Sequence, residues 1–299
     1  LERLSKAKDF TRAPYVSTYW YEFNVNKKPV DDVRVRRALN LGLDKQALID
    51  HVTRGGQIAA THFVPEITGF GYAEALQKDK SLFHGKDHDF NPARARELLS
   101  AAGYKVVKDG AHFRAEGFPS LEILYNTSEG HRSIAVAIQA MWKQHLGISV
   151  ALRNEEWKVM LKNLRDGHFQ VARFGWVADY NHPHTYLDLF LSFSNSNWTR
   201  WKSVELDSLV KRAAAAADLT ESMRLYIEAE KYVVAAMPRL PIYFYTKSTL
   251  AKPYLKGLWP NAQNEHAVRF MWVDDQWRAN RGNSASFEPA ELPAAGTID

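Results

Sequence analysis

The chain has 299 residues, which is enough for one large domain or two smaller ones with a sizeable buried core. It has no cysteine, which excludes disulfides, thiolate metal sites and cysteine nucleophiles. The net charge is +5, but basic and acidic residues are interleaved without a dense basic run, so a nucleic-acid partner is not favoured.

The first predicted elements are a strand and two capped helices. Aromatic and β-branched residues at 15–25 predict a strand. Asp32 and Asp44 are typical N-caps, so we expect a helix directly after each of them, the second one ending at Gly55. Residues 57–88 show little periodicity, which predicts a long loop.

An alternation of helices and strands follows. Asn91 and Pro92 suit an N-cap and a first helical residue, and predict a helix to Ala102. The next segments alternate between the two patterns: strands at 121–127, 148–153 and 169–176, and helices at 134–147 and 157–167. Their short connections imply right-handed crossovers and a largely parallel sheet. Since ligands bind beyond the carboxyl ends of such strands, residues 127–131 and 176–179 are the segments to examine.

The C-terminal third combines helices, strands and a polar tail. Apolar stripes predict helices at 206–213 and 218–234, followed by a strand at 240–246. A further strand is expected at 268–273. The residues from 281 onward lack apolar periodicity, so we expect a disordered tail.

Motifs of common enzyme classes are absent from the sequence. There is no P-loop and no GxSxG, HExxH or GxGxxG pattern. The histidines are dispersed, except in one cluster of two His and two Asp: Asp179, His182, His184 and Asp188. Such a cluster could ligate zinc or nickel, but Pro183 and the neighbouring aromatic residues fit a structured loop equally well.

Asp179 has a second interpretation. It follows Trp176 directly after a predicted strand, and a buried carboxylate there needs a partner. That partner is either an internal cation such as Arg173 or the ammonium group of a ligand.

Several segments resemble a known family. Residues 32–39 read DVRVRRAL and are followed by Leu43-Asp44-Lys45, which resembles a segment of the large solute-binding proteins of peptide and nickel importers. Residues 124–131 (LYNTSEGH), 171–181 (VARFGWVADYN) and 241–245 (PIYFY) are similar to segments of bacterial oligopeptide-binding proteins. The run at 171–181 is the most specific of these.

The resemblance implies a fold class and a domain organisation. The fold is α/β, a periplasmic-binding-protein-like lobe with a largely parallel sheet flanked by helices, plus segments of a second, mostly missing lobe. Residues 19–245 would form the ligand-binding lobe. Residues 1–18 and 246–280 would belong to the other lobe, with 281–299 as the tail. We therefore expect the C-terminal half of a longer protein, as a fragment, a split gene product or a truncated form.

The resemblance also implies roles for charged residues. Asp179 would accept the N-terminal ammonium group of a peptide, in a charge-assisted hydrogen bond. Arg173 and His131 would meet the C-terminal carboxylate of ligands of different lengths, although His131 could equally cap or pack at the start of its helix. Glu22 matches an acidic position near the family's cleft, or forms a hinge salt bridge.

Aromatic side chains would form the walls of the ligand's side-chain pockets. The resemblance assigns this role to Trp176, Trp157 and Tyr245, while Trp157 also fits a plain core position. The peptide backbone would pair with extended protein segments, so main-chain bonds would give affinity with little side-chain selectivity. Water molecules in roomy pockets would compensate for the differences between peptide side chains.

The implied function is peptide capture, not catalysis. The protein would be the substrate-binding component of an ABC peptide importer, periplasmic or on the cell surface, monomeric and without a cofactor. Its partners would be short peptides and a membrane permease, with no nucleic acid. We expect half of a two-lobed clamp to bind peptides weakly.

Two other functions stay open at this point. One is the binding of a different ligand: a nickel chelate, haem or a cell-wall peptide. The other is a metallohydrolase that uses the loop of His182 and His184.

Overall fold

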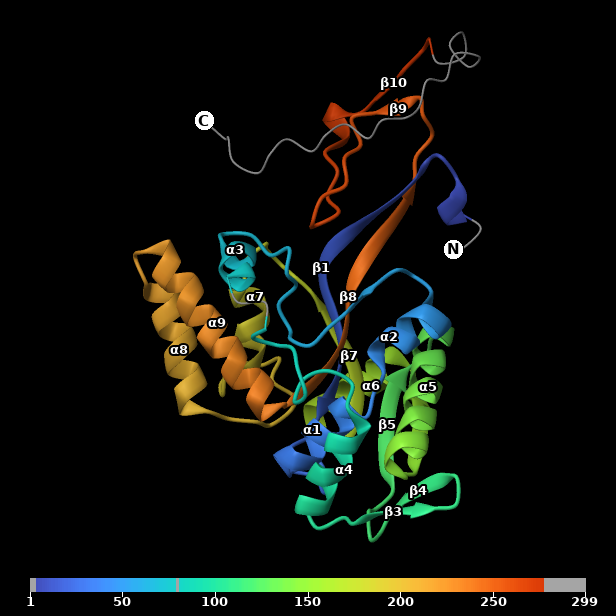
Figure 1. Cartoon of the computed structure of the whole chain (residues 1–299). Helices are drawn as coiled ribbons and strands as arrows, with labels where there is room; N and C mark the ends of the chain where they lie inside the picture. Colours follow the sequence, from blue (N-terminus) through green and yellow to red (C-terminus); the bar gives the residue numbers. More distant parts are fainter. Residues whose placement is uncertain (1–3, 79–80, 277–299) are drawn as a thin grey trace.

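A six-stranded sheet forms the centre of the protein (Figure 1). The structure is a computed structural model that describes residues 4–78 and 81–276. The strands of the sheet, in spatial order, are β2 (Ile58–Ala59), β8 (Arg239–Leu250), β1 (Phe10–Phe23), β7 (Val171–Val177), β5 (Leu121–Asn126) and β6 (Val150–Glu155). Because β1 is antiparallel to β7 and β8, while β5 is parallel to β6 and β7, strands β5 to β8 all run in one direction. The predicted α/β fold with a largely parallel sheet is confirmed.

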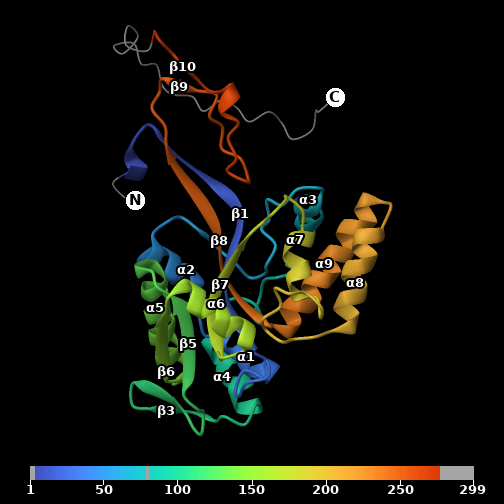
Figure 2. The same cartoon turned by 180° about the vertical axis from the view of Figure 1, so that it is seen from behind.

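Helices cover both faces of this sheet. In the described residues they are α1 (Val33–Leu41), α2 (Lys45–Leu48), α3 (Tyr72–Gln77), α4 (Pro92–Ala101), α5 (Glu129–Leu146), α6 (Trp157–Asp166), α7 (His184–Leu187), α8 (Val204–Ala215) and α9 (Leu219–Ala236). Short 3-10 or π turns lie at Leu4–Lys6, Ile49–Thr53, Asp188–Phe190 and Val268–Phe270. One apolar cluster joins α3, α6, α7, α8 and α9 to one face, and a second joins α1, α2, α4 and α5 to the other. Figures 1 and 2 show these two layers from opposite sides.

The predicted helix caps are confirmed. The Asp32 carboxylate accepts the main-chain N–H of Arg34 at 2.8 Å, and the Asp44 carboxylate accepts that of Ala47 at 2.9 Å. The Asn91 side chain accepts the N–H of Arg94 at 3.1 Å, directly before Pro92 at the first helical position. Each bond satisfies an amide that the helix itself leaves unpaired.

The ends of β1 and β8 leave the sheet as a two-stranded ribbon (Figure 1). Residues 10–14 of β1 pair with 246–250 of β8, and the register shifts between Pro14 and Thr18. The ribbon leads to a small pair of strands, β9 (Leu255–Lys256) and β10 (Trp272–Val273).

Three predictions of secondary structure are wrong or incomplete. Residues 57–88 contain β2 and α3 besides loop. The expected strand at 268–273 is a 3-10 turn followed by the two-residue β10. A hairpin of β3 (Val106–Asp109) and β4 (His112–Ala115) was not predicted. The expected tail at 281–299 lies outside the described residues.

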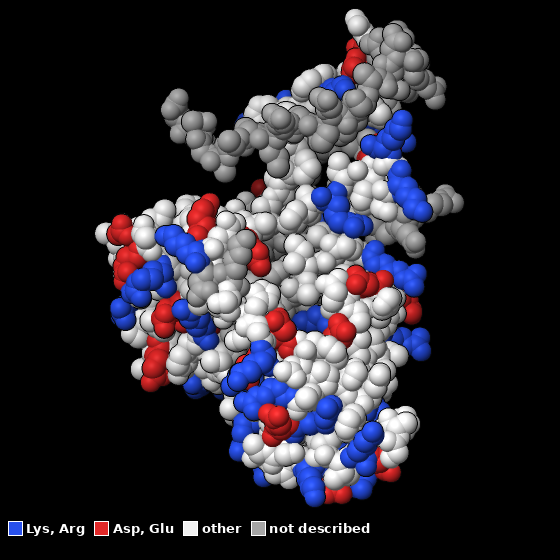
Figure 3. Space-filling view, viewed as in Figure 1, with Lys and Arg blue, Asp and Glu red and all other residues white. Residues whose placement is uncertain are grey.

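Charges of both signs are mixed over the face shown in Figure 3. The expectation that the protein has no nucleic-acid partner stays a prediction. Among the described residues, no helix has the length and apolar character needed to span a bilayer.

Candidate ligand-binding site

Arg173 lies at the centre of an aromatic cluster. It is half-buried on β7, and its guanidinium carbon is 4.6 Å from the ring centroid of Tyr19 on β1. Its two terminal nitrogens are each 3.4 Å from an oxygen, Nη1 from Asn126 Oδ1 and Nη2 from the Tyr245 hydroxyl. Strands β1, β5, β7 and β8 therefore all contribute to one site around a single cation.

His131 joins the same cluster from the first turn of α5. Its Nδ1 is 3.3 Å from the Tyr19 hydroxyl, so the two side chains share a hydrogen bond. Burial and the positive charge of Arg173 lower the pKa of His131 to about 4. The imidazole is therefore neutral at pH 7, where it can donate or accept a hydrogen bond but carries no charge.

Arg173 forms no salt bridge with any carboxylate in the part of the chain that the structure describes. Its contacts are two long hydrogen bonds and the ring of Tyr19. Its Nε is buried and has no acceptor. Since a buried cation is stabilised best by an anion, this arrangement suits a carboxylate supplied by a ligand.

Asp179 lies two residues beyond β7 and is exposed to solvent. The Thr185 hydroxyl is 3.2 Å from the Asp179 carboxylate Oδ2 and donates to it. The hydroxyl oxygen of Thr185 also accepts the main-chain N–H of Asp179 and the indole N–H of Trp176, each at 3.2 Å. Thr185 therefore ties Asp179 to Trp176, and no cation pairs with Asp179 among the described residues.

The two charged groups are separated by an extended segment. Arg173 and Gly175 face the same side of β7, because they pair in register with Tyr21 and Tyr19 of β1. Six residues of extended chain correspond to about 20 Å, so Asp179 lies at most about that far from Arg173 along the strand direction. Gly175 leaves little bulk between them. A side chain there would meet the carbonyl oxygen of Thr18 at 2.9 Å from its Cβ.

Two of the sequence-predicted aromatic residues lie on the other face of β7. Trp176 packs against the apolar cluster of α7 and α9. Trp157, 39% exposed, stacks on Phe174 with ring centroids 5.9 Å apart. The structure therefore groups Arg173, His131 and Tyr245 in one cluster, Asp179 and Trp176 in a second, and Trp157 beside neither.

Glu22 lies apart from both groups, in the core. It is fully buried, and its Oε1 is 3.2 Å from Arg239 Nε and 3.3 Å from the indole nitrogen of Trp20. Burial raises its pKa, although the charge of Arg239 opposes this. Of the two roles expected for Glu22, an internal salt bridge is the one that this geometry favours.

The alternative of a metal site at Asp179, His182, His184 and Asp188 finds no support in the geometry. Within residues 4–78 and 81–276, no three His, Asp or Glu side chains are placed to hold a metal ion. His184 Nδ1 is 3.1 Å from the Tyr226 hydroxyl, and the His182 ring lies against Phe70 and Tyr226 at centroid distances of 5.3 and 5.1 Å. The loop therefore packs through aromatic contacts, the alternative that the sequence left open.

Sequence reasoning missed three residues of the site. Tyr19 and Asn126 contact Arg173, and Thr185 contacts Asp179. Asn126 stands at the carboxyl end of a strand, one residue before the segment selected for examination. Tyr19 and Thr185 carry no local signal, because their roles depend on partners far away in the sequence.

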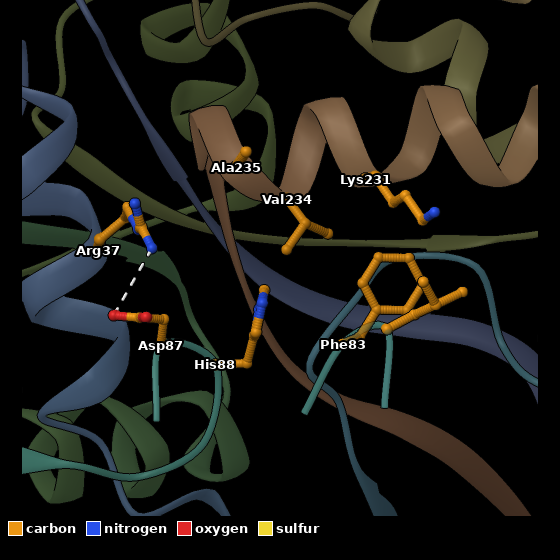
Figure 4. A pocket seen from close by; sticks show the side chains of 8 residues that line it. Arg37, Phe83, Asp87, His88, Lys231, Val234 and Ala235 are labelled. Atoms are coloured by element: carbon orange, nitrogen blue, oxygen red, sulfur yellow. Dashed lines mark ion pairs between the residues drawn. The ribbon is translucent and has the colours of Figure 1, made fainter. Parts of the chain in front are cut away.

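A separate cavity of about 200 Å³ lies near the amino ends of the parallel strands (Figure 4). Its walls come from α1, α9 and the loop between α3 and α4: Arg37, Leu82, Phe83, Asp87, His88, Lys231, Val234 and Ala235. Arg37 and Asp87 lie next to each other on one side of it, with 3.9 Å between the nearest charged atoms (Figure 4). No predicted site residue lines this cavity, and it is smaller than the roughly 300–1,000 Å³ of typical ligand pockets.

Comparison with known proteins identifies the family. The profile of the bacterial extracellular solute-binding proteins, family 5 Middle, matches residues 1–198. The periplasmic murein peptide-binding protein MppA of Escherichia coli K12 is 37% identical over 244 residues, 82% of this chain and 43% of that protein. The periplasmic oligopeptide-binding protein OppA of the same strain is 34% identical over 244 residues, 82% of this chain and 42% of that protein.

The fold agrees with these relatives. The crystal structure of Haemophilus influenzae OppA in complex with the peptide RPPGFSPFR has a TM-score of 0.76 and 31% identity, covering 91% of this chain and 52% of that one. The class is thus that of bacterial extracellular solute-binding proteins. Within that class, the chain belongs to family 5 of the bacterial extracellular solute-binding proteins. It spans about two fifths of the length of the curated relatives it matches.

Proposed function

We propose that this protein captures short peptides by their two charged ends and serves an ABC importer. The observation that carries the proposal is Arg173, a half-buried cation without a carboxylate partner in the described structure. The exposed carboxylate of Asp179 supplies the opposite charge on the loop just beyond the strand that carries Arg173. Opposite charges at this spacing suit a zwitterionic ligand in an extended conformation.

The chemistry of capture follows from these positions. The ligand's carboxylate pairs with Arg173 and takes a hydrogen bond from neutral His131, while its ammonium group pairs with Asp179. A peptide of about three to five residues spans about 10–17 Å when extended. The lengths of the Arg173 and Asp179 side chains cover the rest of the distance between the two ends of the site. Tyr245 lies beside the carboxylate end of the ligand. Trp176 lies near the ammonium end, on the opposite face of β7. Binding through the termini and the main chain gives little selectivity for the side chains of the peptide.

The domain boundaries are part of the proposal. Residues 19–245 form the lobe that carries Arg173 and Asp179, and residues 1–18 and 246–280 belong to a second lobe. In support, Phe270 and Trp272, beyond the ribbon, are 56% and 57% exposed. Exposed aromatic residues of this kind are typical of surfaces that another part of a protein covers.

The location and partners follow from the relatives. MppA and OppA are periplasmic, so we place this protein outside the cytoplasm, where it delivers its ligand to a membrane permease. The name of MppA adds murein peptides to the ligands worth testing. That the protein acts as a monomer stays a prediction.

Blocked peptides test the proposal directly. A tripeptide with free termini, its N-acetylated form and its C-amidated form are titrated into the chain and followed by calorimetry or by tryptophan indole NMR signals. Each blocked form is expected to bind at least about tenfold more weakly than the free peptide, since a charge-assisted bond is worth about 1.5–3 kcal/mol. The ratio of the dissociation constants of blocked and free peptide can be interpreted whether the chain binds peptides tightly or weakly. Equal binding of all three forms would overturn capture by the termini.

A further inference from the structure

Glu230 of α9 is a buried carboxylate without a cationic partner in the described structure. Its side chain is fully buried, and its Oε1 accepts the main-chain N–H groups of Phe63 and Val64, each at 2.8 Å. Its Oε2 accepts the hydroxyl of Tyr72. Three donors from one segment therefore compensate the loss of water around this carboxylate.

These donors lie at the two ends of one connection. Phe63 and Val64 follow β2, and Tyr72 is the first residue of α3. The carboxylate of Glu230 thus fixes both ends of the segment 63–72 against α9. The segment has little regular structure of its own, and these bonds hold it in place together with the burial of Phe63, Val64 and Tyr72 in the apolar cluster.

The middle of the same segment contacts the loop that carries Asp179. The N–H of Gly69 donates to Asn181 Oδ1 at 3.0 Å, and the rings of Phe70 and His182 are 5.3 Å apart. The backbones are close here, because a Cβ on Gly69 would lie 3.3 Å from the Asn181 carbonyl oxygen. Both views show α3 beside α7, the helix that follows this loop (Figures 1 and 2).

We propose that Glu230 is a positioning residue for the ammonium-binding loop. Through the segment 63–72 it holds residues 179–182 where the Asp179 carboxylate can meet a ligand's ammonium group. This inference deepens the function proposed above and rests on it for its consequence in binding. The physical coupling between Glu230 and the loop is independent of any ligand.

The coupling depends on the charge of Glu230. Burial raises its pKa to about 7, against the opposing effect of its three hydrogen bonds. When the carboxylate takes a proton, one of its oxygens becomes a donor, and the remaining bonds lose the charge assistance that roughly doubles their strength. The raised pKa means that the buried site favours the neutral group despite this loss, whereas opening the segment to water returns the group to its ordinary pKa. The segment is therefore held most firmly below about pH 4.5 and less firmly as the pH rises through 7.

Burial keeps the phenols and the imidazole nearest to Glu230 uncharged in this range. His184 of α7 also lies close, with its Nδ1 3.1 Å from the Tyr226 hydroxyl on α9, and it is present in both Glu230→Gln and the unsubstituted protein, so the comparison of the two isolates the effect of Glu230. Burial raises the pKa of Tyr72 on α3 and of Tyr186 on α7, and the charge of Glu230 adds to both effects, so both phenols stay neutral. Burial lowers the pKa of His62, next to Phe63, to about 3. Glu66 acts on Tyr72 through its negative charge.

Hydrogen–deuterium exchange of the full chain tests the coupling without a ligand. Exchange is measured at several pH values between 5.5 and 8.5 and corrected for intrinsic rates. In the unsubstituted protein, protection of the amides in 178–184 is expected to fall about tenfold as the pH rises, because the charge on the buried Glu230 favours opening of the segment. Glu230→Gln keeps two acceptor bonds but cannot ionise, so its protection should stay at the low-pH level throughout. Glu228→Gln, on the same helix and exposed to solvent, is the matched control and should follow the unsubstituted protein.

A second variant sharpens the test. The Tyr72 hydroxyl lowers the pKa of Glu230, so Tyr72→Phe should shift the midpoint of the protection profile to higher pH. Parallel profiles in Glu230→Gln and in the unsubstituted protein would overturn the proposal. So would a loss of protection in Glu230→Gln that is equal in β5 and in the loop, because this would reveal a general structural role.

Peptide titrations at pH 5.5 and 8 then separate the two proposals. If Glu230 positions the loop and Asp179 binds the ammonium group, raising the pH from 5.5 to 8 should weaken binding by the unsubstituted protein several-fold more than binding by Glu230→Gln. A pH-dependent exchange profile with no such difference in affinity would support the coupling and count against Asp179 as the ammonium site.

Discussion

The two charged ends of the candidate site are built in different ways. Arg173 lies on a strand inside the sheet, half-buried against the ring of Tyr19 and surrounded by groups from four strands. Asp179 lies on a loop beyond that strand, exposed, with Thr185 as its main support. The positive end is fixed by the fold before a ligand arrives, whereas the negative end keeps its hydration.

This difference follows from the free energy of desolvation. A half-buried guanidinium loses part of its hydration, so the surrounding rings and hydroxyl groups have to be in place when the protein folds. An exposed carboxylate keeps its hydration until it binds the ligand, and can therefore lie on a loop. Substitutions at the Arg173 end should change stability and affinity together, and substitutions at the Asp179 end should change affinity alone.

The largest effect is expected from Arg173→Gln. The peptide's carboxylate would lose its partner, which should weaken binding by about 2–5 kcal/mol in the complete two-lobed protein. Tyr19 would lose the cation over its ring, which should lower the free energy of unfolding by about 1 kcal/mol. Calorimetry and thermal unfolding measure the two effects. Arg153→Gln on β6, whose partners are Glu122 and Glu155, is the control and should leave affinity unchanged.

Asp179→Asn should weaken binding by about 2 kcal/mol or more, again in the complete protein, because the ligand's ammonium group would face a neutral amide. Thermal unfolding should change little, since surface substitutions are usually within about 0.5 kcal/mol. The contrast between the two ends would be wrong if Asp179→Asn lowered the unfolding temperature as much as Arg173→Gln does.

Thr185→Val should have a smaller effect on affinity, about 1 kcal/mol. The valine preserves the shape of the side chain but removes the hydroxyl that donates to Asp179 Oδ2 and accepts the indole N–H of Trp176. Thr185→Ser keeps the hydroxyl and should retain most of the affinity. Peptide titrations of the pair are informative, because equal losses in both variants would point to packing and not to the hydrogen bonds.

The smallest effect concerns the protonation of His131. NMR titration of its ring should give a pKa near 4, and Arg173→Gln should raise this value while burial keeps it below 6.5. Because the folded pKa lies below the unfolded value, stability from neutral His131 is full above about pH 6.5 and is lost as the pH falls towards 4. An unchanged pKa in the variant would mean that the two side chains are not coupled.

Local signals account for much of what the sequence predicted correctly. Asp32 and Asn91 cap their helices through bonds to amides two or three residues away, so the pattern is complete within a short window. The strands at 121–126, 150–155 and 171–177 each begin with an apolar residue and contain further apolar residues among a few polar ones. The rule that places sites at the carboxyl ends of parallel strands selected the regions of both His131 and Asp179.

The errors concern features that depend on distant partners. Helix α3 begins after Gly71, which has a φ of +81° and no side chain that could cap the helix. Tyr72, its first residue, instead bonds to Glu230 far along the chain. Glu22 could not be assigned from the sequence, because Arg239 approaches it only when β1 and β8 pair. The sequence also left a metal site open at Asp179, His182, His184 and Asp188, because these residues are neighbours in sequence, but Asp179 and the two histidines face different partners.

The position of β1 has a consequence for how the chain acquires its structure. This first strand lies in the middle of the sheet, between β7 and β8, which are made from much later parts of the chain. During synthesis, both of its hydrogen-bonding edges stay open until most of the polypeptide has emerged. Pairing over such separations is slow, and an open apolar edge attracts the edges of other chains. We therefore expect refolding yields that fall with protein concentration and that improve when chaperones cover this strand.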